Sequence, residues 1–509
     1  MSARERIEGV DFAVDEHIWG HRLYDEQLPH LTVLEFLGVL GSNQDAPLVE
    51  PDKAKARYKP KRQIRLRSLL FNNPYVEMVR EKAISDEDKW AHWKELFIAQ
   101  ATGHGDLEID YLRAVFPTFE DFAKAIDLLR SSAFEARSNK RWSSKFIFPF
   151  GPDALYEDLR IDTGGASNDR RFFARTGEIL YLMLCRSAKG PELGAKLVDR
   201  LYAPSSPLNR LARALQGESQ YAPEPRDVGY LPHRSHPRFD TLCDDWLAIL
   251  SRDMPIYDAL EHLIASAGLN MLLYFLECGK SETGDTEPIE IVCEIISRER
   301  TKVRALSGDS YHGNQALSER AVQSSIERFT LTPEWEKALA SDDPNGQCML
   351  ALRQRFQWPP DESDEENDYS QMSGEEMIRM LVKKALSRHG QHFGKIHTAW
   401  ARAIGLGSRR LARRTRYAPN DRLLKTLVIS MVDERMQLDE FLHEAKRRYG
   451  LVIGDAEGAY LIRAGLIDQE ALSDNRDNLE SRLMSLGLIR RLSDSCSFVE
   501  NPFAAGGNS

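Results

Sequence analysis

Apolar residues recur at intervals of three and four positions along most of this chain, as they do across 31–37 and 119–129. That spacing places them on one face of a helix. Two segments, 175–186 and 258–277, are largely apolar over several turns, so we expect them at the centres of cores. Strand-like runs are limited to 144–150, 289–296 and a pair near the C-terminus. The pattern predicts a mainly α, multidomain protein with small β elements.

The length of the chain also indicates several domains. Its 509 residues exceed the roughly 250 to 300 that one hydrophobic core supports. The clearest boundary follows Trp358, where Pro359 and Pro360 stop a helix and 361–368 holds six acids in eight residues. The predicted parts are α-rich domains at 1–240 and 241–357, an acidic linker at 358–372, a basic helical segment at 373–420 and a winged-helix-like domain at 421–509.

The last 90 or so residues have the most specific pattern. Apolar stripes within 423–431 and 438–445 predict two helices, with Asn420 able to cap the first and Gly450 ending the second. A third helix, capped by Ser473 or Asp474, precedes two strand-like runs around a turn at 493–495. This order is typical of a winged helix-turn-helix.

In such a domain the third helix would enter a major groove of DNA. It offers Asn475, Arg476, Asn478, Ser481 and Arg482 to bases or phosphates, and Arg490 and Arg491 lie where the wing begins. Two features depart from the pattern. The helix also carries Asp477 and Glu480, and the 22 residues of 451–472 replace a compact turn.

Charge is distributed unevenly along the sequence. Between Arg379 and Lys425 there are thirteen Lys or Arg residues and one acid, so this block has net charge +12 (13 − 1), while the rest of the chain sums to −22 (−10 − 12). Ser373 and Glu376 form a capping box before it. Written as a helix, 408–417 would place five arginines within an arc of about 160°. They are Arg409, Arg410, Arg413, Arg414 and Arg416.

Guanidinium groups suit phosphate because their planar fork donates two parallel hydrogen bonds. The block therefore favours contact with the backbone of duplex DNA. An anionic membrane or acidic protein partner is an alternative, as is neutralisation by the protein's own acids. The acidic run 361–368 could fold back on the arginines and compete with a ligand. A second basic cluster, 53–67, has eight Lys or Arg residues and no acid.

No recognisable catalytic motif is present, and we predict no catalytic residue, metal ligand or cofactor. The string at 190–197 lacks phosphate-loop spacing, and the phospholipase-D-like triplet 92–94 lacks its acid. His17, His21 and Glu26 could hold a metal, but structural roles are favoured. Asp158, Asp162 and Asp169 flank a glycine turn, where ordinary loop solvation explains them. For His389, His392 and His397, phosphate contact or surface exposure is favoured over metal binding.

The six cysteines lie far apart without a CxxC pair, so we expect buried apolar thiols. The charged N-terminus and the absence of a long apolar run indicate a cytoplasmic, bacterial protein that does not enter a membrane.

Four strings resemble α-rich accessory proteins of bacterial anti-phage defence islands, of the methylation-associated type. They are HIWGHRLYDEQ from His17, RRFFARTGEILYLMLCRS from Arg170, IYDALEHLIASAGLNMLLYFL from Ile256 and the ending LESRLMSLGLIRRLSDSCSFVENPF. They span 75 of the 509 residues. The resemblance implies action on DNA with partner subunits and carries over no catalytic residues.

The leading hypothesis is a non-enzymatic accessory subunit that binds DNA through its C-terminal region and docks other defence components. A scaffold that binds acidic proteins is one alternative. A metal-dependent nuclease using His17, His21 and Glu26 is another.

Overall fold

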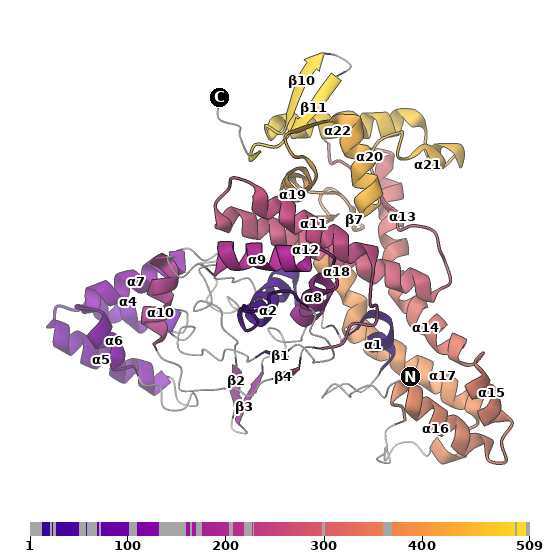
Figure 1. Ribbon diagram of the computed structural model, residues 1–509, viewed down its shortest axis with the longest axis horizontal. Helices are drawn as coiled ribbons and strands as arrows, with labels where there is room; N and C mark the ends of the chain where they lie inside the picture. Colours follow the sequence, from indigo (N-terminus) through magenta and orange to yellow (C-terminus); the bar gives the residue numbers. More distant parts are fainter. Residues whose placement is uncertain are drawn as a thin grey trace. The chain divides into compact units, whose positions relative to one another are not determined.

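The computed structural model describes residues 13–20, 23, 27–49, 57–58, 69–70, 73–100, 109–131, 159–162, 165–168, 176–202, 207–217, 226–227, 229–297, 301–359, 369–493 and 496–504. They form a mainly helical protein with small sheets (Figure 1). The mainly α prediction is confirmed. The predicted strand at 144–150, the basic cluster 53–67 apart from 57–58, and the acidic run 361–368 lie outside the described residues.

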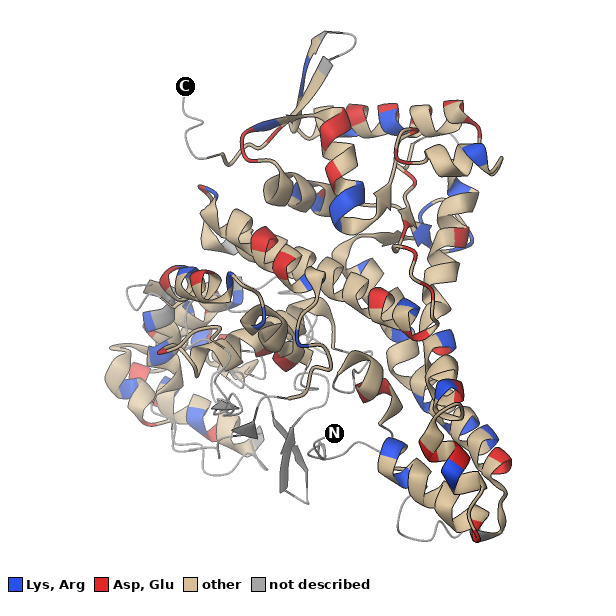
Figure 2. Cartoon of the chain, turned by 45° about the vertical axis from the view of Figure 1, so that its right-hand side comes forward, with Lys and Arg blue, Asp and Glu red and all other residues tan. Residues whose placement is uncertain are grey.

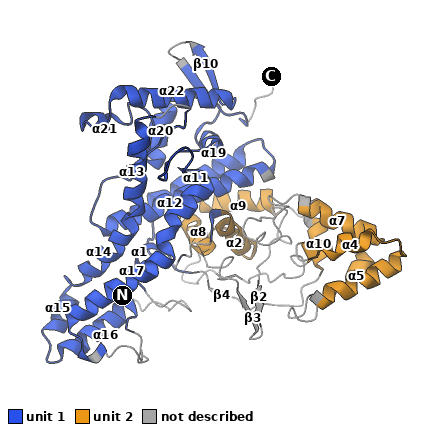
Figure 3. Cartoon of the chain, turned by 180° about the vertical axis from the view of Figure 1, so that it is seen from behind, with its two compact units in different colours: residues 1–29, 229–509 blue, residues 30–228 orange. Residues whose placement is uncertain are grey.

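The chain divides into two compact units, residues 30–228 and residues 1–29 with 229–509 (Figure 3). The five-part division proposed from sequence remains a prediction. The unit of residues 1–29 and 229–509 nevertheless has a core that includes residues from 269–317, 401–417 and 423–499. Buried side chains from three of the proposed parts, 241–357, 373–420 and 421–509, therefore pack together.

The unit of residues 30–228 is built from short helices. These are α2 (Pro29–Gly41), α4 (Tyr75–Arg80), α5 (Asp86–Gln100), α6 (Tyr111–Val115), α7 (Phe119–Ser131), α8 (Thr176–Cys185), α9 (Gly190–Leu201) and α10 (Pro207–Gln216). Two antiparallel pairs join β1 (Arg57–Tyr58) to β4 (Arg226–Asp227) and β2 (Leu159–Asp162) to β3 (Gly165–Asn168). Every residue of α8 is buried, as its apolar run predicts.

The other unit begins with α1 (Val14–Trp19) and continues after residue 229. Its helices from there to residue 404 are α11 (Pro237–Ser251), α12 (Ile256–Glu282), α13 (Val303–Gln315), α14 (Leu317–Phe329), α15 (Pro333–Leu339), α16 (Pro344–Phe356), α17 (Gly374–Gln391) and α18 (Ile396–Ile404), with short 3-10 turns η3 (Tyr369–Gln371) and η4 (Phe393–Lys395). The capping box of Ser373 and Glu376 at the start of α17 is confirmed.

The long helix α12 is the centre of this unit. By length and composition its segment Asp258–Glu282 could cross a membrane, but 89% of its apolar window is buried inside the protein. It packs against α11, α14, α18 and α19, which explains why it is apolar on nearly all sides.

The C-terminal elements are α19 (Asp421–Met431), β8 (Arg435–Gln437), α20 (Leu438–Tyr449), β9 (Leu451–Val452), α21 (Ala459–Arg463), α22 (Gln469–Ser485), β10 (Ile489–Ser493) and β11 (Cys496–Glu500). Strands β10, β11 and β8 form an antiparallel sheet in that order. Strand β5 (Ile291–Val292), shorter than the predicted 289–296 run, pairs in parallel with β9.

The ends of these helices follow the local signals in part. The Asn420 side chain accepts a hydrogen bond from the Leu423 amide, and Gly450 ends α20 in the left-handed conformation at φ 68°, both as predicted. The predicted start of the last helix was wrong. Asp468, rather than Ser473 or Asp474, caps α22, which therefore begins at Gln469.

The predicted arginine helix at 408–417 is also wrong. Gly407–Ser408 (β6) and Arg416–Tyr417 (β7) form a two-stranded antiparallel pair, and the residues between them form a loop. The Tyr417 carbonyl accepts a hydrogen bond from the Glu294 amide at 3.0 Å, which holds this backbone extended. A helix would also have stacked like charges three and four residues apart, which is unfavourable.

Candidate phosphate-binding loop and pocket

Residues 409–415, here called the arginine loop, connect β6 to β7. The Ala412 amide donates to the Arg409 carbonyl at 3.1 Å, and the Ser408 hydroxyl accepts from the Arg410 amide at 3.1 Å. Leu411 has a left-handed backbone at φ 59°, which is uncommon for a residue with a side chain. These contacts define a tight turn that places basic side chains on both sides of Leu411.

A buried ion-pair triad lies beneath the loop. Glu294 is fully buried, and its Oε1 accepts from Arg304 Nε at 2.8 Å while its Oε2 pairs with Arg416 Nε. The Arg416 side chain is 1% exposed. Both carboxylate oxygens are thus used by arginines, and the shared charge leaves the triad with one net positive charge.

The same two guanidinium groups hold the loop backbone. Arg416 Nη2 donates to the Arg410 carbonyl at 2.8 Å, and Arg304 Nη1 donates to the Leu411 carbonyl at 3.1 Å. Arg416 therefore has a structural role that the sequence did not indicate. The triad determines the loop's shape because it anchors two consecutive carbonyls at the turn.

The other four predicted arginines lie at the surface. Arg409, Arg410, Arg413 and Arg414 are exposed, and none forms an ion pair with a described residue. The Arg409 guanidinium donates to the Arg413 carbonyl at 3.3 Å, which leaves its charge uncompensated. In Figure 2 the Lys and Arg positions of this region are coloured blue along the ribbon. Among the described residues, the basic loop is open rather than covered by acids.

A cavity of about 1200 Å³ lies between the arginine loop and the start of α13. Its lining residues are Thr301, Lys302, Arg304, Ala305, Gly308, Asp309, Leu411, Ala412, Arg413, Arg414 and Arg416. Five of these are cations and one is an acid. Lys302 pairs with Asp468, which raises the pKa of the lysine through their hydrogen bond. The cavity is suited to an anion.

The predicted groove residues of α22 are placed differently. Arg476 pairs with Asp439 at 2.6 Å and Arg482 pairs with Asp421 at 2.6 Å, while Asn478 is half-buried. Arg490 is exposed at the start of β10, and Arg491 lies 4.0 Å from Glu480.

Asn475 cannot reach a groove because it is fully buried. Its side chain accepts from the Ile295 amide and donates to the carbonyls of Cys293 and Ile453, all between 2.8 and 2.9 Å. It therefore links α22 to the segments around β5 and β9 and is not available for contact with DNA.

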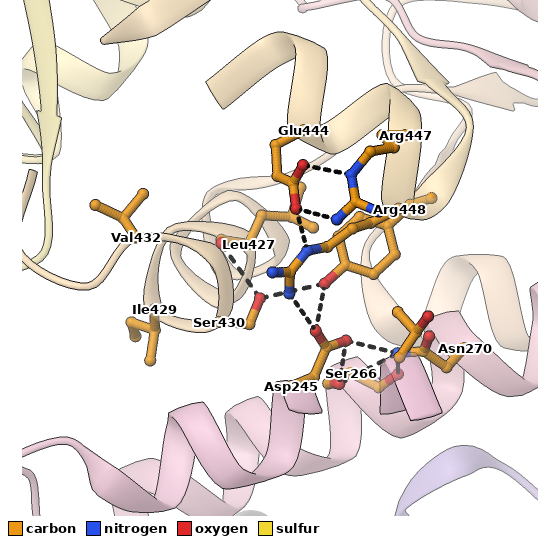
Figure 4. A network of polar contacts seen from close by, with 12 residues as sticks. Asp245, Ser266, Asn270, Leu427, Ile429, Ser430, Val432, Glu444, Arg447 and Arg448 are labelled. Atoms are coloured by element: carbon orange, nitrogen blue, oxygen red, sulfur yellow. Dashed lines mark hydrogen bonds and ion pairs between the residues drawn. The ribbon is translucent and has the colours of Figure 1, made fainter. Parts of the chain in front are cut away.

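A second polar cluster, centred on Asp245, joins α11, α12 and α20 (Figure 4). The buried carboxylate accepts from Tyr449 Oη at 2.7 Å, Asn270 Nδ2 at 2.8 Å and Ser266 Oγ at 3.2 Å. Arg448 lies 3.4 Å away and is also paired with Glu444. Burial raises the pKa of Asp245 to about 6, and these hydrogen bonds oppose that rise.

The cluster was not predicted, because residues 245 and 449 are 204 positions apart. Hydrogen-bond donors surround the carboxylate, which indicates a structural contact that orients α20.

The histidines near the basic block are buried, contrary to the prediction of exposure. His389 is fully buried, with Nδ1 3.2 Å from Asp15 and Nε2 3.0 Å from Ser318 Oγ. His392 is 8% exposed. His397 lies 2.7 Å from the Tyr417 hydroxyl, and burial lowers its pKa to about 3.

The proposed metal set of the nuclease alternative is only partly described. His17 Nε2 lies 2.6 Å from the Arg355 carbonyl, whereas His21 and Glu26 lie outside the described residues. Within the described ranges, no three His, Cys, Asp or Glu side chains are grouped as metal ligands. The expected burial of the thiols is confirmed for Cys185, Cys243, Cys278, Cys293 and Cys348.

Residues 398–499 match the family model of the Methylation-associated defense system protein MAD7. The match extends from α18 through the arginine loop to β11. This match supports the resemblance of the chain to accessory proteins of defence islands, of the methylation-associated type. No curated protein and no solved structure matches the chain.

Proposed function

We propose that this chain is a DNA-binding, non-enzymatic accessory subunit of a bacterial anti-phage defence complex. Its arginine loop contacts the phosphate backbone of duplex DNA, and other surfaces bind further subunits of the system. The observation that carries the proposal is the set of four exposed loop arginines that form no ion pair with a described residue. Guanidinium groups that have no ion pair and lie on a defined turn can neutralise phosphates at a low cost in ordering entropy.

We further propose that residues 421–504 include a winged helix-turn-helix. The support is the order α19, β8, α20, α22, β10, β11 and the sheet order β10–β11–β8. In this proposal α22 makes few phosphate contacts, because Arg476 and Arg482 are already paired with acids. The arginine loop supplies most of the electrostatic attraction, and exposed Arg490 adds to it from the wing.

The test is a mobility-shift titration with duplex DNA over a range of salt concentrations. We expect wild type to bind at low salt with a steep salt dependence. Changing Arg409, Arg410, Arg413 and Arg414 to alanine should weaken binding to all sequences alike and reduce the log–log salt slope by about 3 to 4, since each phosphate contact contributes about 0.9.

A matched control removes four exposed cations elsewhere in the same unit and outside the basic block, Arg234, Arg320, Arg328 and Lys337. This control changes the net charge by the same amount as the loop variant. If the position of the charges matters, its log–log salt slope should fall much less than that of the loop variant. Absence of duplex binding by wild type at low salt would refute the proposal. Equal reductions of the salt slope in the two quadruple variants would show that the arginine loop is not the site of phosphate contact.

A protein-docking scaffold is the second candidate, favoured by the internal pairing of Arg476 and Arg482 on α22. A docking surface needs no spare positive charge on that helix. Capture of co-encoded defence subunits by the purified chain after nuclease treatment would support this role, and capture that depends on added DNA would contradict it.

A further inference from the structure

Arg416, one of the residues that line the cavity beside the arginine loop, carries a buried hydrogen-bond donor without an acceptor among the described residues. The Arg416 side chain is 1% exposed, and its Nη1 has no hydrogen-bond partner within the described part of the chain, although Nε and Nη2 are both used. Buried polar groups are nearly always paired, and an unpaired group of a charged side chain is especially unfavourable. A ligand that accepts a hydrogen bond from Nη1 would remove this penalty.

The start of α13 provides a second, independent feature on the same cavity. Lys302 occupies the N-cap position and makes no side-chain cap. The neighbouring Thr301 hydroxyl, which could serve the first turn, instead donates to Glu294 Oε1 at 3.2 Å. The first turn of a 13-residue helix, with its positive end, therefore lies at the wall of the cavity without a side-chain cap, an arrangement that favours phosphate.

The size and composition of the cavity indicate a ligand larger than phosphate alone. At about 1200 Å³ it exceeds the roughly 300 to 1000 Å³ of typical small-molecule pockets. Ala305, Gly308, Leu411 and Ala412 add apolar surface to a lining that otherwise consists of five cations, Thr301 and Asp309. Arg413 and Arg414 present planar groups on which a base can stack.

We propose that this cavity binds one nucleotide, holding its phosphate with Arg416 Nη1 and the first turn of α13 and its base against the apolar wall. The ligand is either a free nucleotide or the 5′-terminal nucleotide of a strand. In the second case the inference deepens the proposed function and rests on it, because the exposed loop arginines would hold the adjoining backbone.

The variant Gly308→Glu tests the site without breaking the triad. A Cβ at Gly308 meets nothing closer than the Thr415 carbonyl at 4.0 Å, so the new carboxylate can extend into the cavity. Glutamate is also a better helix former than glycine. Gly313→Glu is the matched control, since Gly313 lies in the same helix, has nothing within 4 Å of its Cβ and does not line the cavity.

Binding is measured by calorimetry with deoxyadenosine 5′-monophosphate and with one short single strand carrying either a 5′-phosphate or a 5′-hydroxyl. We expect Gly308→Glu to weaken binding of the preferred phosphate probe by about 10- to 100-fold, as loss of a charge-assisted contact does, and Gly313→Glu to leave it unchanged. Tight binding of the mononucleotide with equal affinity for both strands identifies a free nucleotide. Preference for the phosphorylated strand identifies a strand end.

The inference is overturned if wild type binds neither phosphate probe, or if the two glycine variants behave alike. Duplex binding separates this failure from that of the proposed function. Wild type that binds duplex DNA but no nucleotide keeps the proposed function and loses the site. Wild type that binds a nucleotide but no duplex DNA keeps the nucleotide site and refutes the proposed function.

Discussion

Replacing Glu294 with glutamine should release the arginine loop. The substitution keeps the shape of the side chain but removes the only carboxylate within the triad, whose Oε1 and Oε2 each accept from an arginine. The new amide group would also point an N–H at a guanidinium. Because Glu294 and Arg416 are 0% and 1% exposed, little water can replace the lost partner.

Breaking a buried ion pair from one side costs about 3 to 5 kcal/mol, because a charge remains buried without compensation. We therefore expect the local free energy of opening at the loop to fall by about 3 kcal/mol or more. The Glu294 amide donates to the Tyr417 carbonyl, so exchange of this amide should report the change. A loss of about 3 kcal/mol corresponds to exchange that is faster by about two orders of magnitude.

Hydrogen exchange read by mass spectrometry on peptides covering 289–296 and 407–418 is the suitable assay. It measures local opening and does not require the whole chain, which has two compact units, to unfold in one transition. Glu290→Gln is the control, because Glu290 lies 3.7 Å from Lys446 in a pair that is about one third exposed. Such a pair contributes about 1 kcal/mol at most.

The double variant Glu294→Gln with Arg416→Gln sharpens the test. If the two side chains interact directly, the double variant should recover part of the summed loss, with a coupling of about 1 to 3 kcal/mol. Exchange in Glu294→Gln that matches the Glu290→Gln control, or losses that simply add, would refute the view that the triad holds the loop.

Three further changes test other parts of the structure. Asp245→Asn should alter the pH dependence of stability: the pKa of Asp245 is raised to about 6, so wild type loses up to about 3 kcal/mol relative to the variant as pH rises from about 4 to 6, and parallel denaturation curves over that range would contradict this. Gly450→Ala should lower the denaturation midpoint through a loss of about 2 kcal/mol or more, since φ is 68° and a Cβ would lie 2.1 Å from the Ile289 carbonyl oxygen; an unchanged midpoint would argue against this turn. Asn475→Ala should lower the free energy of unfolding by about 2 to 4 kcal/mol, because three buried backbone groups lose their hydrogen-bond partner. Hydrogen exchange of the Ile295 amide should then be faster.

The features that could be predicted from sequence are those whose causes are local. Ser373 and Glu376 satisfy each other's backbone within one turn, and Asn420 caps an amide three residues away. Gly450 ends its helix in a conformation that glycine adopts easily. Asp468 follows the same rule as Asn420, because its side chain accepts a hydrogen bond from the Ala471 amide three residues away.

The arginine loop could not be predicted because its conformation depends on distant residues. The spacing of the arginines fits one face of a helix, yet Arg416 is paired with Glu294, which is 122 positions away. The carbonyls of Arg410 and Leu411 are likewise held by side chains from β7 and α13. The helical spacing of the arginines and the tertiary contact of Arg416 with Glu294 therefore favour different conformations, and the buried ion pair determines that this segment is a loop.

Charge counted along a sequence overstates what is available to a ligand, because pairing determines which charges are spare. Arg416, Arg476 and Arg482 all belonged to the predicted DNA contacts, and each already binds an acid of this chain. The four loop arginines do not pair with a described residue, so the positive field of the region is concentrated on one short turn. A rigid turn covers fewer phosphates than a helix face would, which favours a local grip over a long interface. The proposed complex should therefore depend on partner subunits or on α22 for any sequence preference, while the loop supplies affinity that does not distinguish one base pair from another.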